Sequence, residues 1–230
     1  FHGPIGVGKF TTALAYARVL LCHDRGADLA GRVIACDVCP SCRLLTGLSP
    51  EQQTTEDDDT HGLTTAHPDL HVIRKELARF SDDASTRNRK LTRIPVEVLR
   101  SALIEPANLA PKLGGGKVFI VDEAELLNPA GQNALLKTLE EPPEGTTLIL
   151  VTGNEDRLLP TIRSRCMRIA FSPLSDSAVQ DWCAKHVPEL SVDQQRVLVE
   201  FASGSLGRAQ LITSYGLLAW ADAVLPALDR

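Results

Sequence analysis

Apolar residues recur along the chain in two patterns, one typical of buried strands and one typical of helices. The continuous apolar run at 117–121 indicates a strand covered on both faces, as in a parallel sheet. A second buried strand is predicted at 147–152, and shorter strands at 69–73 and 167–171. Helical spacing predicts helices over 11–21, over 94–107 with Pro95 in the first turn, and from 128 to the prolines at 142 and 143. Strands that alternate with helices predict an α/β fold with a right-handed parallel sheet.

The pattern changes near Ser172-Pro173. Beyond this point only helical spacing remains, over about 175–186, 191–203 and 205–214. We therefore expect an α/β domain over 1–172 and a small helical domain over 173–230, which includes the start of a C-terminal region.

Two polar segments interrupt the predicted α/β domain. Residues 50–62 are strongly acidic, and residues 79–93 carry mixed charge. Neither segment has enough apolar side chains to bury a core, so we expect both to be exposed loops.

Composition limits the class of protein more than its function. With 230 residues, 43% of them hydrophobic, the chain can bury a core. No apolar run approaches the ~20 residues that span a bilayer. The formal net charge of −5 gives no general basic surface, so contact with nucleic acid must be local or shared with partners. We expect a cytoplasmic protein with no membrane partner.

A glycine-rich segment at the start of the chain matches the phosphate-binding pattern G-x-x-x-x-G-K. The matching residues are Gly3, Gly8 and Lys9, with a further glycine at Gly6. Glycines let backbone amides turn toward phosphates, the following helix adds its dipole, and Lys9 adds a charge. The alternative is a glycine-rich turn without a ligand, which the helix predicted directly after the loop disfavours.

The residue after the lysine departs from this pattern. Phe10 stands where a Ser or Thr hydroxyl would bind Mg²⁺, and Thr11 comes one position too late. We therefore expect weak binding of ATP or ADP, impaired Mg²⁺ binding, and weak or absent hydrolysis. A buried strand normally precedes such a loop, so we expect a chain that begins at Phe1 to be a fragment, incomplete also beyond Arg230.

A second signal of a nucleotide site follows the apolar run at 117–121. Asp122 and Glu123 come at the C-terminal end of this strand, where ligands sit in open α/β sheets. In a working ATPase, Asp122 would hold Mg²⁺ through its water shell and Glu123 would polarise the attacking water, a role we expect to be weak or vestigial here. Thr152, at the end of the next strand, would sense the γ-phosphate. The alternative is a solvated strand end.

Four cysteines have the spacing of a metal site. Cys36, Cys39 and Cys42 form two overlapping C-x-x-C steps, and Cys22 offers a fourth thiolate. Four sulfurs fit tetrahedral zinc and leave no open position, so we expect a structural zinc ion in a module over about 22–45. The alternative is a set of reduced thiols without metal.

Two further segments resemble bacterial DNA polymerase III clamp-loader subunits. They are Asn133-Ala-Leu-Leu-Lys-Thr-Leu-Glu-Glu-Pro-Pro143 and Leu158-Leu-Pro-Thr-Ile-Arg-Ser-Arg-Cys166, and the Ser-Arg-Cys ending is highly specific to clamp loaders. The resemblance covers nearly the whole chain. It implies an AAA+ P-loop domain with a zinc module inserted after the first helix, then a helical lid and a C-terminal collar. The gap between Cys22 and Cys36 is longer than the family's common form.

Within this family the chain resembles the delta-prime type more than the ATP-hydrolysing gamma/tau type. The shared segments are His67-Pro68-Asp69, Asp122-Glu-Ala-Glu125-Leu-Leu and Gly204-Ser-Leu-Gly-Arg-Ala209, and Phe10 fits a decayed nucleotide site. The resemblance implies a stator, a rigid flank against which motor subunits open the sliding clamp. A gamma/tau-type ATPase stays the main alternative. A Holliday-junction branch migration motor is disfavoured because such motors lack the cysteine module.

The resemblance also implies roles for two arginines. Arg165, in the Ser-Arg-Cys frame, would reach a neighbouring subunit's ATP as an arginine finger. Arg208, which matches the family's lid arginine, would approach a nucleotide bound by its own chain. Without this frame Arg165 would be a surface arginine at a strand edge. The implied partners are gamma/tau and delta subunits in a hetero-oligomer, with the sliding clamp and primer–template DNA contacted through the assembly.

Overall fold

The computed structural model describes residues 1–46, 66–80, 92–218 and 220. The predicted polar insert at 50–62 and most of the insert at 79–93 lie outside these residues.

The chain forms two compact units. The first comprises Phe1–His2 and Phe10–Ile169, and the second comprises Gly3–Lys9 and Ala170–Arg230. The sequence predicted one division near Ser172-Pro173, whereas the structure groups the glycine loop with the C-terminal helices.

A three-stranded parallel sheet forms the centre of the first unit. Its strands are β3 (Leu70–Ile73), β4 (Lys117–Val121) and β5 (Thr146–Leu150), in that order across the sheet. The register pairs the last residue of β3 with that of β4, and the last residue of β4 with that of β5. All three strands therefore end at one edge. The predicted α/β fold with a parallel sheet is confirmed.

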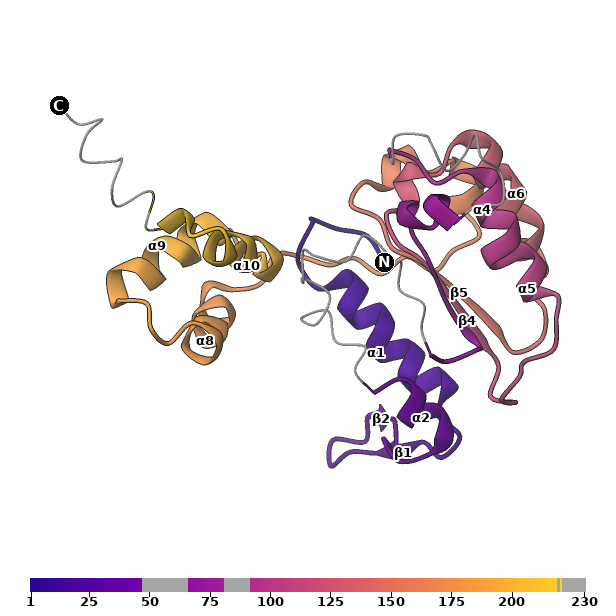
Figure 1. Ribbon diagram of the computed structural model, residues 1–230, viewed down its shortest axis with the longest axis horizontal. Helices are drawn as coiled ribbons and strands as arrows, with labels where there is room; N and C mark the ends of the chain where they lie inside the picture. Colours follow the sequence, from indigo (N-terminus) through magenta and orange to yellow (C-terminus); the bar gives the residue numbers. More distant parts are fainter. Residues whose placement is uncertain (47–65, 81–91, 219, 221–230) are drawn as a thin grey trace. The chain divides into compact units, whose positions relative to one another are not determined.

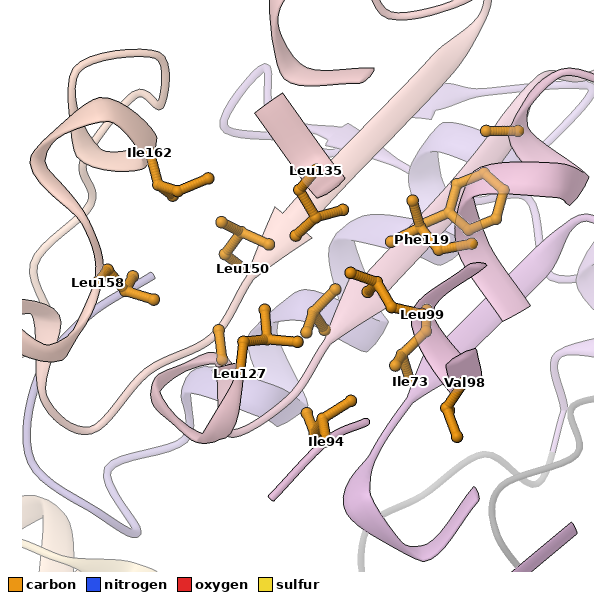
Figure 2. Packing of buried hydrophobic residues seen from close by; sticks show 14 of the residues in the cluster. Ile73, Ile94, Val98, Leu99, Phe119, Leu127, Leu135, Leu150, Leu158 and Ile162 are labelled. Carbon is orange, nitrogen blue, oxygen red and sulfur yellow. The ribbon is translucent and has the colours of Figure 1, made fainter. Parts of the chain in front are cut away.

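The two faces of the sheet are covered by different helices (Figure 1). Side chains alternate along a strand, so Val118 and Ile120 pack in a cluster with α1 (Lys9–Leu21), while Phe119 and Val121 pack on the opposite side. Figure 2 shows the second cluster, in which strand residues meet helical ones. Its labelled members are Ile73, Ile94, Val98, Leu99, Phe119, Leu127, Leu135, Leu150, Leu158 and Ile162. Each such buried side chain contributes about 1.5–3 kcal/mol.

The helices on this second face match the predicted segments, with one difference at a helix start. α6 (Pro129–Glu140) begins after Asn128, whose Oδ1 accepts the Gly131 N–H at 2.7 Å. The predicted 94–107 helix is a continuous succession of α4 (Val96–Leu99), the π-helical η3 (Arg100–Ile104) and α5 (Glu105–Ala107). Pro95 caps this helix instead of lying in its first turn. The residue before a proline favours an extended backbone, and Ile94 forms an isolated bridge with Leu127.

The strand predicted at 167–171 is wrong, although the structure describes these residues. Ile169 accepts one hydrogen bond from the His2 N–H at 3.0 Å, and no named strand forms there. β5 ends at Leu150, two residues before its predicted end, and Thr152 forms an isolated parallel bridge with His2. The first unit also contains short 3-10 helices and a short α-helix, which are η2 (Lys75–Phe80), η4 (Ala124–Leu126), η5 (Glu155–Arg157) and α7 (Pro160–Arg163).

Three helices at their predicted positions form the second unit. They are α8 (Asp176–His186), α9 (Val192–Ala202) and α10 (Leu206–Ser214). Each follows a serine whose Oγ accepts a backbone N–H of its first turn; the serines are Ser175, Ser191 and Ser205. Their apolar faces form a separate core. None of the helices that the structure describes is long and apolar enough to cross a membrane.

A fall in pH is expected to destabilise the first unit through His71. Its half-buried ring stacks on Phe119, with the centroids 4.6 Å apart, and burial together with the Lys117 charge lowers the pKa of His71 below 6.5. The unfolded chain therefore binds this proton more tightly. The His71 contribution to the free energy of unfolding is fully present above the unfolded pKa and is lost as the pH falls below it. Urea unfolding at about pH 7.5 and about pH 5.5 should show a smaller pH effect for His71→Phe than for the wild type; equal effects would contradict this prediction.

Candidate functional site

The glycine loop lies in the second unit, and its lysine is bonded to the loop itself. Lys9 is buried, and its Nζ donates to the carbonyl oxygens of Gly3 at 2.7 Å and Pro4 at 2.5 Å. Gly6 and Gly8 have φ values of 79° and 91°, which glycine adopts without strain. Lys9 is therefore occupied by the loop's own carbonyls, and an anion could use its charge only after Lys9 leaves them.

The start of α10 holds the outer side of this loop. Ser205 Oγ donates to the Ile5 carbonyl at 3.0 Å, and the Gly207 N–H donates to the Gly6 carbonyl at 3.0 Å. A Cβ on Gly6 would lie 2.3 Å from Ser205 Oγ, so this close approach requires glycine. Arg208 is exposed in the first turn of the same helix. The helix that carries Arg208 is thus bonded to the loop.

At the carboxyl edge of the sheet, each expected acidic residue is paired with a cation. Arg74 Nη2 lies 2.9 Å from Asp122 Oδ2, and Lys75 Nζ lies 3.0 Å from a Glu123 carboxylate oxygen. The parallel register of β3 and β4 places the two residues after β3, Arg74 and Lys75, beside the two residues after β4, Asp122 and Glu123. Glu123 also has φ 51°, a left-handed conformation that is uncommon outside glycine. Both carboxylates that an ATPase would use are therefore neutralised within the chain.

Phe10 takes part in the same arrangement. The Arg74 Cζ lies 4.1 Å from the centre of the Phe10 ring, a cation–π contact. Thr152, which follows the neighbouring strand, is buried, and its Oγ1 accepts the Asn154 N–H at 3.1 Å. Thr11 is exposed on α1. Arg74 thus joins Asp122 to the side chain that replaces the expected hydroxyl.

The charges at this edge depend on one another. Burial raises the pKa of Asp122, and the neighbouring Arg74 charge opposes that rise. Burial also acts against the charge of Lys75, but the contact with Glu123 outweighs it and raises the pKa of Lys75. The Arg74 charge therefore favours the ionised form of this partly buried carboxylate.

The cysteine module is a small, separately built part of the first unit. Between the end of α1 and α2 (Pro40–Leu44), two-residue strands β1 (Gly26–Ala27) and β2 (Val33–Ile34) form an antiparallel hairpin. All six cysteines of the chain lie in the described part, and none forms a disulfide. The sulfur atoms of four of them lie within 4.8 Å of one another, and these are Cys22, Cys36, Cys39 and Cys42.

The geometry of this cluster fits a structural zinc ion. Tetrahedral zinc with Zn–S bonds of about 2.3 Å places its sulfurs about 3.8 Å apart, close to the observed spacing. Backbone N–H groups donate to the Sγ atoms of Cys22 at 3.3 Å, Cys36 at 3.3 Å and Cys39 at 3.4 Å, and such bonds favour thiolates. Burial opposes ionisation of Cys39, yet the N–H groups of Cys42 and His23 outweigh it and lower the pKa of Cys39 to about 6. Burial raises the pKa of Cys42 to about 12, so a metal would have to displace that proton.

Buried polar residues attach this module to the sheet. His67 Nδ1 accepts the Asp69 N–H at 3.1 Å, so its Nε2–H donates to Ser41 Oγ at 2.8 Å. Ser41 Oγ in turn donates to the Leu21 carbonyl at 2.6 Å. The Asp69 carboxylate accepts two backbone N–H groups, at 2.7 and 2.8 Å, from the loop before β4. These bonds give the His67-Pro68-Asp69 segment a structural role.

Arg165 lies in the irregular segment after α7. Its Nη2 lies 2.6 Å from Glu140 Oε1 at the end of α6, and its Nη1 donates to the Thr161 carbonyl at 2.9 Å. About a third of its side chain is exposed, 35% against 47% for Glu140. Arg165 also lines a cavity of about 400 Å³ beside β5, with Leu148 and Met167 among the other lining residues. The guanidinium is therefore accessible at the surface and held by a carboxylate of its own chain.

Comparison with known proteins assigns the family. A family model described as "DNA polymerase III, delta subunit" matches residues 1–175, three quarters of the chain. The chain belongs to this family. A DNA polymerase III subunit delta' from Pseudomonas aeruginosa is 32% identical over 216 residues, 94% of this chain and 55% of that protein. The Escherichia coli subunit delta' is 29% identical over 89% of this chain and 50% of that protein.

Another kind of DNA polymerase III subunit is also similar to this delta-family chain. The subunit gamma/tau of Mycobacterium tuberculosis is 32% identical over 171 residues, 74% of this chain and 23% of that protein. The chain spans about half the length of the delta' relatives. Neither percentage identity nor aligned share separates the two types, since the Escherichia coli subunit tau is 28% identical over 94% of this chain and 28% of that protein.

Within this member of the delta family, sequence reasoning found most of the polar groups but missed their partners. Asp122 and Glu123 lie at the predicted sheet edge, and the four cysteines come together as predicted. Arg74 and Lys75 were missed, although a basic pair directly after a strand is a visible signal once the strand register is known. Glu140, the partner of Arg165, gave no signal beyond its place in the Leu-Glu-Glu segment.

Proposed function

We propose that the protein is a delta-prime type subunit of a DNA polymerase III clamp loader, which helps to load the sliding clamp onto primed DNA. The observation that carries the proposal is the family match, together with delta' relatives aligned over 89–94% of the chain. The subunit acts as a stator, a rigid flank for the motor subunits, and need not turn over ATP itself.

The first unit and the glycine loop are proposed to form an AAA+ module that has lost its own catalysis. Phe10 supplies no metal ligand, and Asp122 and Glu123 are paired with Arg74 and Lys75. The loop and Lys9 would bind ATP or ADP weakly. The helices of the second unit would be the lid, and Arg208 would approach the nucleotide from it. The four-cysteine module would carry structural zinc.

Arg165 is proposed to act on another chain's nucleotide. Its guanidinium is partly exposed and paired with the surface carboxylate of Glu140, a contact worth about 0–1 kcal/mol in water. A phosphate group carries more charge than one carboxylate and accepts the same planar fork of donors. A neighbouring subunit's ATP would therefore draw Arg165 away from Glu140 at little energetic cost.

A gamma/tau-type ATPase is the second candidate, and the similarity to a gamma/tau subunit favours it. An active ATPase must release Asp122 and Glu123 to water and metal. The pairing of both carboxylates, with a phenyl ring at the hydroxyl position, weighs against it. The proposed partners are gamma/tau and delta subunits, with the clamp and primer–template DNA reached through the assembly, in the cytoplasm.

Reconstitution tests the proposed function. The full-length protein, gamma/tau and delta subunits are mixed and separated by size-exclusion chromatography with light scattering, and clamp loading onto primed DNA is then measured. We expect a stable hetero-oligomer whose clamp loading requires the protein, and negligible ATP turnover by the protein alone. Absence of the hetero-oligomer, or robust turnover by the isolated protein, would rule out the stator role.

A further inference from the structure

The acidic edge of the sheet contains its own cation. Parallel strands β3 and β4 end in register, so the Arg74-Lys75 pair lies beside the Asp122-Glu123 pair. The Arg74–Asp122 contact is 2.9 Å long and shielded, with side-chain exposures of 25% and 17%. The Lys75–Glu123 contact is more exposed, at 28% and 41%. Arg74 therefore makes the less solvated of the two pairs.

Arg74 is held on a second side by the aromatic ring. Its guanidinium carbon lies 4.1 Å from the centre of Phe10. A planar guanidinium stacks on aromatic faces and is weakly hydrated, which suits it to a partly buried position better than an ammonium group. Phe10 thus does more than omit a hydroxyl, because it provides the surface on which this cation rests.

A divalent metal does not fit these residues. Mg²⁺ requires near-octahedral oxygen ligands at about 2.0–2.1 Å and usually keeps several waters. Here the nearest charged group to Asp122 Oδ2 is a guanidinium, and the position of the usual hydroxyl ligand is a phenyl ring. A metal ion added beside Asp122 would face the positive charge of Arg74 at short range.

We propose that Arg74 is a fixed cation that takes the place of the divalent metal at this edge of the sheet. It neutralises the partly buried Asp122, is supported by Phe10, and makes the edge indifferent to divalent ions. Its Nε is buried and finds no hydrogen-bond partner among the described residues. If Arg74 only forms a structural ion pair, its removal lowers the stability of the protein and has no other effect. If Arg74 takes the place of a metal ion, the protein without Arg74 should also be stabilised by a divalent metal.

The test measures thermal unfolding of the purified, zinc-loaded protein with and without millimolar MnCl₂, using Mn²⁺ alone as the probe. We expect the wild-type Tm not to respond to Mn²⁺. Arg74→Gln should unfold at a lower temperature, because Asp122 loses its partner, and Mn²⁺ should raise its Tm by a few degrees. The double variant Arg74→Gln/Asp122→Asn should recover stability without Mn²⁺ and show no response to it.

Two control variants separate the site from general effects. Arg74→Lys keeps a cation and should stay insensitive to Mn²⁺. Arg163→Gln breaks a surface pair with Asp156 in the same unit and should gain no response. Mn²⁺ insensitivity of a folded Arg74→Gln protein would overturn the proposal.

A second measurement applies even if Arg74→Gln does not fold. Mn²⁺ is titrated into the wild-type protein and into Asp122→Asn, and binding is followed by electron paramagnetic resonance. We expect the two proteins to bind the same amount of Mn²⁺. A Mn²⁺ site that is present in the wild type and lost in Asp122→Asn would also overturn the proposal. The test uses neither clamp nor partner subunits, so its result is independent of the proposed clamp-loader function.

Discussion

Replacing Arg165 with alanine is expected to lower the ATPase rate of a reconstituted clamp loader by about 10²-fold or more. An arginine finger stabilises charge on the transferring phosphoryl group, and alanine removes both the charge and the two-pronged hydrogen bonding. The isolated protein should keep its fold, since the Arg165 side chain is partly exposed and its ion pair with Glu140 is a surface contact. The measurement is single-turnover ATP hydrolysis by the complete loader with clamp and primed DNA.

Matched variants show whether the effect belongs to Arg165. Arg168→Ala removes a nearby arginine that pairs with Glu155 and has 54% of its side chain exposed; it should leave the rate within about twofold. Arg165→Lys keeps the charge without the planar fork and should give an intermediate rate. Equal rates for the Arg165→Ala and wild-type loaders would show that Arg165 acts on no nucleotide.

Replacing Cys42 with serine is expected to remove bound zinc and unfold the cysteine module. Cys42 Sγ is fully buried among the other three sulfurs, and the module is otherwise held by a hairpin of two-residue strands and a short helix. Structural zinc contributes about 10–16 kcal/mol to the folding of small zinc domains near neutral pH. Zinc content should fall from about one equivalent to near zero, and limited proteolysis should cut within residues 23–41.

A cysteine outside the cluster provides the control for zinc. Cys166→Ser should keep the full zinc content and the proteolysis pattern of the wild type, because Cys166 does not belong to the group of four. Two results together would contradict a structural metal site. The wild-type protein would contain no zinc as purified, and treatment with a chelator would leave its resistance to the protease unchanged.

The parts of the fold predicted from sequence are those with a strong local pattern. The β4 run is buried at all five positions, and a strand covered on both faces has no polar side to obscure the apolar run. α9 and α10 begin after serine caps that are visible in the sequence. These elements needed no knowledge of their partners.

The errors arose where a partner in space decides the structure. Ile94 precedes a proline and bridges Leu127, and the helix starts at Val96. In the segment 167–171, Ile169 accepts a hydrogen bond from the His2 N–H, but no named strand forms there. The hairpin strands β1 and β2 are exposed along both residues and carry no hydrophobic signal.

The candidate site shows the same limit. Residue types and spacing predicted Asp122 and the cysteines, whereas Arg165 was predicted only from the family resemblance of its Ser-Arg-Cys segment. The ion partners of these residues could not be predicted in the same way. Arg74 pairs with Asp122 because of the strand register, and Glu140 pairs with Arg165 because it lies at the end of a helix. Sequence order places these partners 48 and 25 residues apart, beyond the reach of any local pattern.

The most direct test of the proposed function compares two variants in the same reconstituted loader. Lys9→Met disables the protein's own glycine loop, and Arg165→Ala disables its proposed action on a neighbouring chain's ATP. We predict that Lys9→Met leaves the DNA-dependent ATPase rate and clamp loading within about twofold of the wild type, while Arg165→Ala lowers both by about 10²-fold or more. Loss of activity in Lys9→Met with full activity in Arg165→Ala would contradict the stator role and identify the protein as a hydrolysing subunit.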